Sequence, residues 1–275
     1  MTSTLKQTDD TMPPEERRVA RRFFAGFVGA LRPARRQLSQ AVLNREIPIE
    51  SLQGAKVESR RILNEFSSDV EIIYREGVEE GAEVGRALAV DRFGVNVRTD
   101  QVPVRTLENL DNWAAQATDD VLTNLGDDAG AFLRGVHEEG LSVPDAADKL
   151  RNEFWDERVE GYRAERVIRT EVVGSSNAGH QSAYEDAPSV VGKQWQTSLD
   201  GRQRDEHGAM HNRIVSPQNN FEFPEGQTAP HLGHFSLPPE LRINCRCVHV
   251  PVFRDQLTDS QFVQLQAGRQ IEVAI

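Results

Sequence analysis

Residues 243–253 read INCRCVHVPVF, and this stretch decides the fold class that we expect. Apolar and polar side chains alternate along it and β-branched residues are frequent, which is the pattern of a half-buried strand. A second extended stretch, VVGKQWQTS at 190–198, precedes it and is followed by a turn signal at Asp200-Gly201. Residues 215–243 are rich in Pro, Asn and Gly and show little periodicity. We therefore predict a small C-terminal α+β module with a few short strands.

The N-terminal two-thirds of the chain is predicted to be mostly helical, so that the whole chain belongs to the α+β class. Apolar residues recur there at helical spacing, beginning with Val19, Phe23 and Phe27. Pro33 is expected to end or kink the first helix because proline has no backbone N–H, and Gly126 is expected to break a later one. The predicted helices cover 15–31, 34–45, 56–90, 105–124, 128–139, 143–153 and 157–186, with a short one near 262–265.

Three of these features carry more specific expectations. Ser142 is a plausible N-cap for the helix at 143–153, with Pro144 in its first turn. Gly77, Gly81 and Gly85 recur every four residues on one side of the 56–90 helix. Acidic residues surround these glycines, which excludes a membrane interface and favours a close crossing of two helices inside the protein.

Composition excludes several classes of protein. The chain has 275 residues, of which 32 are basic and 43 acidic, for a net charge of −11. A net anion is not a general coat for nucleic acid, because phosphates repel it. No apolar run approaches the roughly 20 residues that cross a bilayer, and the first residues lack the basic and apolar regions of a secretory signal. We expect a protein made in the cytoplasm and not inserted in a membrane.

Seven arginines lie within residues 17–36. One interpretation is an amphipathic helix that packs its apolar face on the core and exposes its arginines to solvent. The other is a surface that docks on a partner protein or on DNA phosphates. For that case, the predicted docking residues are Arg17, Arg18, Arg21, Arg22, Phe23 and Phe27.

Six of the seven histidines and both cysteines fall between residues 180 and 249. The densest arrangement is His207-x3-His211 followed by Cys245-x-Cys247. Histidines four residues apart share a helix face, thiolates two residues apart share a strand face, and both groups are good zinc ligands. His207, His211, Cys245 and Cys247 are therefore a candidate zinc site. The alternative is that these side chains pack and hydrogen-bond inside a small module without a metal.

Charged residues also recur inside segments that are expected to be structured. Arg169, Thr170 and Glu171 lie in the helix that leads into the module, and Asp200 is able to fix the turn by bonding backbone amides. Arg202 and Arg204 are suited to bidentate pairs with Glu171 or Asp205.

Four sequence blocks carry a resemblance to a known family. They are A-x-x-V-x-R-T-E at 164–171, followed by Asn177, then G-K-x-W-x-T at 192–197, D-x-R-x-R-x-x-H at 200–207 and N-C-R-C at 244–247. In this order and spacing they resemble the phage head morphogenesis family, the Mu protein F-like minor head proteins. The resemblance covers 160–252 well and, more loosely, the helices from 105. A Gly often follows the family's His by about five residues, whereas Asn212 stands here, and His211 is not a family position.

The resemblance implies a domain organisation. It comprises a disordered tail at 1–14, a helical region at 15–104, a head morphogenesis domain at 105–253 with its motif-bearing core at 160–252, and a tail at 254–275. The motif residues are then expected to hold the fold rather than to perform chemistry. They are Arg169, Thr170, Glu171, Trp195, Asp200, Arg202, Arg204 and Asn244.

The resemblance also implies a minor capsid protein of a tailed virus, located in the virion head near the portal vertex. Its expected role is head assembly and DNA packaging or delivery. The expected partners are the portal protein, the major capsid protein or both, with local contact to packaged DNA left open.

An enzyme is the alternative. A metal-dependent nuclease would use His207 as general base with Asp205, His211 or Asn212 near a metal, and the Arg–Thr–Glu set is faintly similar to ADP-ribosyltransferases. The sequence has no glycine-rich loop to cradle a nucleotide, and Cys-x-Cys does not suggest the open position of a catalytic metal. We therefore expect a structural protein and not an enzyme.

Overall fold

The computed structural model describes residues 12–198, 201 and 203–273. Within these residues the chain forms two compact units, one from 21–76 and 111–168 and the other from 12–20, 77–110 and 169–273. Four long helices contribute residues to both units: α1 (Pro14–Leu43), α3 (Ser67–Phe93), α4 (Val104–Glu138) and α7 (Tyr162–Asp186). The predictions for Asp200, for Arg202 and for most of the tail at 1–14 lie outside the described residues.

The first unit is helical. Besides parts of the long helices it holds α2 (Leu52–Asn64), α5 (Val143–Lys149), the π-helical turn η1 (Leu150–Phe154) and α6 (Trp155–Arg158). The apolar stripe of α1 is buried, and its Phe23 ring meets the edge of Tyr74 with centroids 5.0 Å apart. Ser142 caps α5 as predicted, because its side chain accepts a hydrogen bond from the Asp145 amide.

The prediction of a separate helix at 34–45 after Pro33 was wrong, because α1 runs as one helix from residue 14 to residue 43. Proline removes one backbone hydrogen bond and crowds the carbonyl four residues earlier. Here that carbonyl belongs to Gly29, which has no side chain. Leu31 and Leu38 on either side are both fully buried, and we infer that their burial offsets the lost bond.

The predicted helix at 56–90 is in fact two helices. Glu65 and Phe66 form a tight turn between α2 and α3, and their amides donate to the carbonyls of Ile62 and Leu63 three residues back. Buried apolar residues continue on both sides of the turn, with Leu63 before it and Val70 after it. Because this spacing stays close to helical, hydrophobic periodicity could not reveal the turn.

The predicted break at Gly126 was also wrong, since α4 continues from residue 104 to residue 138. A β-carbon at Gly126 would lie 2.8 Å from the Cα of Arg60, and one at Gly130 would lie 2.5 Å from the amide nitrogen of Lys56. Both glycines therefore allow α2 to cross α4 at close range. Packing of this kind outweighs the helix-propensity cost of glycine, about 1 kcal/mol per residue.

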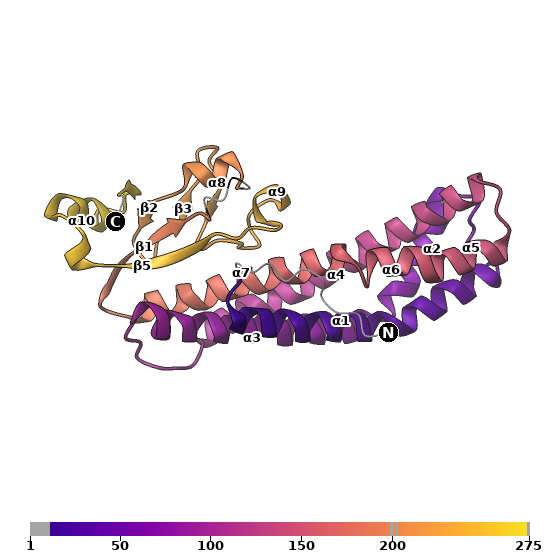
Figure 1. Cartoon of the computed structure of the whole chain (residues 1–275), viewed down its shortest axis with the longest axis horizontal. Coiled ribbons are helices and arrows are strands. Elements are labelled where there is room, and N and C mark those ends of the chain that lie inside the picture. Colours follow the sequence, from indigo (N-terminus) through magenta and orange to yellow (C-terminus); the bar gives the residue numbers. More distant parts are fainter. Residues whose placement is uncertain (1–11, 199–200, 202, 274–275) are drawn as a thin grey trace. The chain divides into compact units, whose positions relative to one another are not determined.

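The second unit contains the strands and confirms the α+β class (Figure 1). Its antiparallel four-stranded sheet has the order β5-β1-β2-β6, and a two-stranded ribbon pairs β3 with β4. The strands are β1 (Val190–Gln196), β2 (Arg213–Val215), β3 (Phe221–Glu222), β4 (Thr228–Ala229), β5 (Val248–Phe253) and β6 (Ile271–Glu272). The short helices are α8 (Asp205–Ala209), α9 (Pro239–Arg242), the 3₁₀ turn η2 (Arg254–Gln256) and α10 (Asp259–Gln266).

The strand predicted at 243–253 begins only at Val248. Asn244 has a left-handed backbone, with φ at +62°, and the Cys245 amide donates to the Arg242 carbonyl at 3.2 Å. Residues 243–247 therefore form a turn and a short irregular segment between α9 and β5, which we call the cysteine turn. Cys245 and Cys247 lie in this turn and not on a strand face as predicted.

Helix α7 packs on the sheet through polar as well as apolar groups. The Lys193 ammonium on β1 donates to Gln181 Oε1 at 2.8 Å, and the Tyr184 hydroxyl donates to the carbonyl of His249 on β5 at 3.0 Å. Ile214 and Val252 belong to another apolar cluster with Leu265 of α10. Strands β1 and β5 are thereby fixed to α7.

Gly81 and Gly85, two of the three predicted glycines of α3, pack as the sequence predicts. A β-carbon at Gly85 would lie 1.9 Å from the carbonyl oxygen of Ser176 on α7, and one at Gly81 would lie 2.1 Å from the Ser175 hydroxyl. The approach is mutual, because a β-carbon at Gly179 would lie 2.0 Å from the Ala82 carbonyl oxygen. Backbones of α3 and α7 therefore meet with no room for a side chain.

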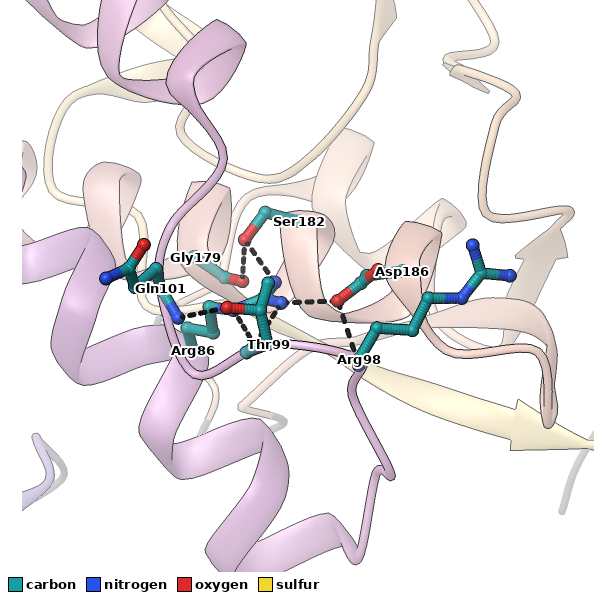
Figure 2. A network of polar contacts seen from close by, with 7 residues as sticks. All are labelled: Arg86, Arg98, Thr99, Gln101, Gly179, Ser182 and Asp186. Carbon is teal, nitrogen blue, oxygen red and sulfur yellow. Dashed lines mark hydrogen bonds and ion pairs between the residues drawn. The ribbon is translucent and has the colours of Figure 1, made fainter.

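A buried guanidinium fixes the segment between α3 and α4, as Figure 2 shows. Arg86 is 1% exposed and forms an ion pair with Asp186 at 2.6 Å. It also donates to the Thr99 carbonyl at 2.7 and 3.2 Å and to the Ser182 hydroxyl at 3.1 Å. Asp186 in turn accepts the Arg98 amide at 3.1 Å. The sequence analysis did not identify this network.

In the part of the chain that the structure describes, none of the helices combines the length and the apolar character that a bilayer crossing requires.

Candidate functional site

The family-like blocks converge on the cysteine turn. Helix α7 contributes Thr170 and Asn177, and α8 contributes His207. Trp195 lies on β1, and Thr197 follows the end of that strand. All of these belong to the second unit. Residues that precede it by 36 to 77 positions in the sequence thus surround one five-residue segment.

Polar side chains from two other segments hold the backbone of the cysteine turn. The Asn244 amide donates to Thr170 Oγ1 at 2.9 Å, and Asn177 Nδ2 donates to the Cys247 carbonyl at 3.3 Å. Arg204 donates to the Ile243 carbonyl at 2.6 Å. Each of these bonds pairs a backbone N–H or C=O group that lies outside the helices and strands. Together they stabilise the left-handed backbone of Asn244.

His207 stands at the centre of the site and is 2% exposed. Its Nε2 lies 2.9 Å from the Leu241 carbonyl oxygen. A carbonyl only accepts, so Nε2 carries the proton and Nδ1 presents a lone pair. Nδ1 lies 3.3 Å from the Cys247 sulfur and 3.5 Å from the Cys245 sulfur. The backbone of His207 is also fixed, because its carbonyl accepts from the Thr197 hydroxyl at 2.8 Å.

The two thiols are buried and interact with each other. A hydrogen bond with Cys245 lowers the pKa of Cys247 to about 5 against the opposing effect of burial. The same bond raises the pKa of Cys245, and burial adds to the increase. The Cys247 amide also donates to the Cys245 sulfur at 3.4 Å. The pair therefore favours one thiolate and one thiol when no cation is bound.

An apolar shell encloses the imidazole and the thiols. The Trp195 ring meets the His207 ring edge-on with centroids 5.6 Å apart, and it makes similar contacts with Phe221 and Phe223 at 5.3 and 5.2 Å. Trp195 is fully buried, and Cys245 and Cys247 belong to the same cluster. The site is thus part of the core of the strand-bearing module.

His207, Cys245 and Cys247 are brought together, with ligand atoms within 4.8 Å of one another. His211, the fourth predicted ligand, is not in this group among the described residues. It lies beyond the end of α8, and its Nδ1 accepts the Thr197 amide at 3.2 Å. The predicted helical i, i+4 relationship fails because α8 ends at Ala209.

The predicted pairing of Arg202 lies outside the described residues. Glu171 lies 3.7 Å from Arg242, a residue that the sequence analysis did not single out, and Arg204 bonds to a backbone carbonyl. Arg169 is half-buried on α7. Arginine suits both roles because its donors can serve a carboxylate or a carbonyl.

The predicted docking residues divide into two groups. Arg18, Arg21 and Arg22 are exposed on α1, and Arg17 is half-buried. Phe23 and Phe27 are each 3% exposed and pack on Tyr74, so including them among the docking residues was wrong. The same apolar stripe that made them conspicuous is the core face of the helix.

Sequence reasoning missed a buried basic cluster beside the site. Lys193 is fully buried and donates to the carbonyls of Pro217 and Pro230 as well as to Gln181, and its burial lowers its pKa to about 7. Burial also lowers the pKa of His180 to about 4 and holds the pKa values of His231 and His249 well below the usual range. In the sequence, the only sign of this buried cluster was that Lys193 lies inside a segment with the pattern of a strand.

Comparison with known proteins identifies the family of this segment. Residues 131–250 match the model of the family described as Phage Mu protein F like protein. No curated protein and no solved structure shows significant similarity to the chain. The matched segment contains all four blocks that converge on the cysteine turn. This match over residues 131–250 confirms the resemblance to the phage Mu protein F-like family that was inferred from the sequence.

Proposed function

We propose that this protein is a structural component of a tailed-virus head, a minor capsid protein that acts in head assembly near the portal vertex and in DNA packaging or delivery. The family match fits a phage head morphogenesis protein. The portal protein, the major capsid protein or both are its proposed partners.

The contacts of the family-like residues support a structural role. Thr170, Asn177 and Arg204 bond to the backbone of the cysteine turn, and Trp195 fills the core beneath it. Residues that serve a reaction are usually presented to a substrate in a concave site. Here the motif residues are instead partners of one another and of the backbone.

Burial of His207 argues against the enzyme alternative. A general base must reach the proton that it abstracts, whereas the His207 ring is 2% exposed and Nε2 is engaged by the Leu241 carbonyl. A nucleic acid strand is too large to approach this position without opening the module. The proposal is therefore that the protein assembles into the head without catalysing a reaction there.

Helix α1 offers the surface for docking. Arg18, Arg21, Arg22, Arg32 and Arg36 are exposed on it. Counted from Arg18, the others follow at 3, 4, 14 and 18 positions, all close to whole helical turns, which places them on one side of the helix. In a chain with a net charge of −11, this basic stripe is the surface suited to an acidic patch on the portal or capsid, or to DNA phosphates.

Charge reversal on the stripe tests the docking role. We expect the double variant Arg21→Glu, Arg32→Glu to co-purify less with the portal and capsid proteins of the same virus, because like charges then meet across the interface. The control is the equally exposed pair Arg105→Glu, Arg269→Glu, which lies off the stripe. Equal recovery of both variants with the partners would refute the docking role of α1.

Mass spectrometry of purified particles tests the structural role itself. We expect the chain in intact virions at a few copies per portal vertex, and in filled as well as empty heads. If it is present in infected cells but missing from particles, the proposal fails.

A further inference from the structure

We propose that His207, Cys245 and Cys247 bind one zinc ion, which cross-links α8 to the cysteine turn and completes the core of the strand-bearing module. The site is independent of the proposed function, because it concerns how the module is held together.

The distances between the ligand atoms match the edges of a zinc tetrahedron. With Zn–N of about 2.0–2.1 Å and Zn–S of about 2.3 Å, tetrahedral angles place nitrogen and sulfur about 3.6 Å apart. Nδ1 of His207 lies 3.3 Å from one sulfur and 3.5 Å from the other. The three atoms therefore need little movement to close around an ion.

The imidazole is already oriented as a ligand. Metal-bound histidines usually donate their second ring N–H to a carbonyl or carboxylate, which fixes the ring and the tautomer. Nε2 of His207 does this with the Leu241 carbonyl at 2.9 Å. The lone pair of Nδ1 is consequently aimed at two sulfurs, an arrangement that requires a thiol proton or a cation between them.

The donor set selects a soft or borderline ion. Two thiolates and one imidazole favour zinc or Cu(I) over Mg²⁺ and Ca²⁺, which take oxygen ligands. None of the three side chains is more than 4% exposed. Catalytic zinc keeps a position open to substrate, whereas here a fourth ligand would have to be as small as water. The enclosure points to a structural ion.

The module has reason to use such a cross-link. Between β1 and β5 the described residues form only short elements, none longer than five residues. The ion would join His207 to cysteines 38 and 40 positions later and thereby close one long loop. Small cores with much irregular backbone commonly depend on a metal or a disulfide for stability.

Metal content and cobalt substitution test the site on the full-length protein. We expect about one zinc per chain after dialysis, as structural sites hold their ion tightly. After removal by chelator, added Co²⁺ should give sulfur-to-cobalt charge-transfer absorption and the intense visible bands of a tetrahedral ion. Zinc returned to the apoprotein should raise the unfolding temperature by several degrees, because it binds only the folded state.

The variants Cys245→Ser and His207→Gln are expected to lose the zinc and the cobalt absorption, whereas His137→Gln, a histidine on α4, keeps both. The cobalt spectrum of the unaltered protein decides the matter if these variants do not fold. A native protein whose two thiols both react freely in the presence of zinc, or whose mass shows a Cys245–Cys247 disulfide, would overturn the proposal.

Discussion

A buried arginine is the clearest case in this protein where one residue decides local structure. Arg86 donates four hydrogen bonds while its side chain is 1% exposed, and the backbone of the 94–103 segment depends on two of them (Figure 2). The Arg86 guanidinium also helps to hold the pKa of Asp186 below its ordinary value against the effect of burial. A charge is retained in a core only when its donors are satisfied in this way.

Replacing Arg86 should therefore be costly. We expect Arg86→Met to lower the free energy of unfolding by about 3 kcal/mol, because it leaves the Thr99 carbonyl and Asp186 without their partner. Arg75→Met is the matched control, since Arg75 is 44% exposed in its ion pairs and such pairs contribute less than about 1 kcal/mol. Urea unfolding measures both, and equal losses would contradict the assignment.

At the scale of elements, glycines decide which helices cross at close range. Gly81 and Gly85 on α3 meet Gly179 and its neighbours on α7, and Gly126 and Gly130 on α4 meet α2. In each case the nearest atoms include backbone, which cannot move aside as a flexible side chain can. Helix propensity alone disfavours all of these glycines.

Two glycine-to-alanine substitutions should have opposite effects. Gly179→Ala places a β-carbon 2.0 Å from the Ala82 carbonyl oxygen, and we expect a loss of at least about 2 kcal/mol in stability from the forced separation of α3 and α7. Gly135→Ala on α4 meets nothing within 4 Å and should gain roughly 0.5–1 kcal/mol. Thermal unfolding measures the difference, and a neutral Gly179→Ala would mean that the crossing is looser than described.

At the scale of the whole molecule, buried bases make stability depend on pH. Lys193, His180, His231, His234 and His249 all have pKa values below their ordinary ones, with burial as the main cause. Each binds its proton less readily in the folded chain than in the unfolded chain. Their contribution to stability is therefore present at high pH and is lost as the pH falls. For the histidines this loss occurs below about 6.5, the ordinary pKa.

We expect the unfolding temperature to fall between pH 7 and pH 4.5. Each depressed histidine contributes a loss of up to ~1.4 kcal/mol per pH unit. Glu16 opposes them, because burial raises its pKa to about 7 and the folded chain keeps that proton, but it is one group against four. His249→Asn should flatten the dependence and His137→Asn should not. An unfolding temperature that is constant or rises toward pH 4.5 would refute the expectation.

The sequence by itself determined the α+β class, most helices, the Ser142 cap, the close approach of the α3 glycines and the family of residues 131–250. These follow from periodicity, local capping and ordered motif blocks, which need no knowledge of distant contacts. Prediction from the sequence failed at Pro33 and Gly126, because packing between helices outweighs local helix propensity there. It failed at Glu65 because the apolar residues keep nearly helical spacing across the turn.

Only the tertiary structure decided the composition of the site. His211 stands four residues from His207, yet it accepts the amide of Thr197, just after β1, because α8 ends at Ala209. The carbonyl of Leu241, 34 residues away, instead fixes the His207 ring. Burial of Lys193 and Arg86 was equally invisible, since a charged residue is admitted to a core by partners that the fold assembles from remote segments.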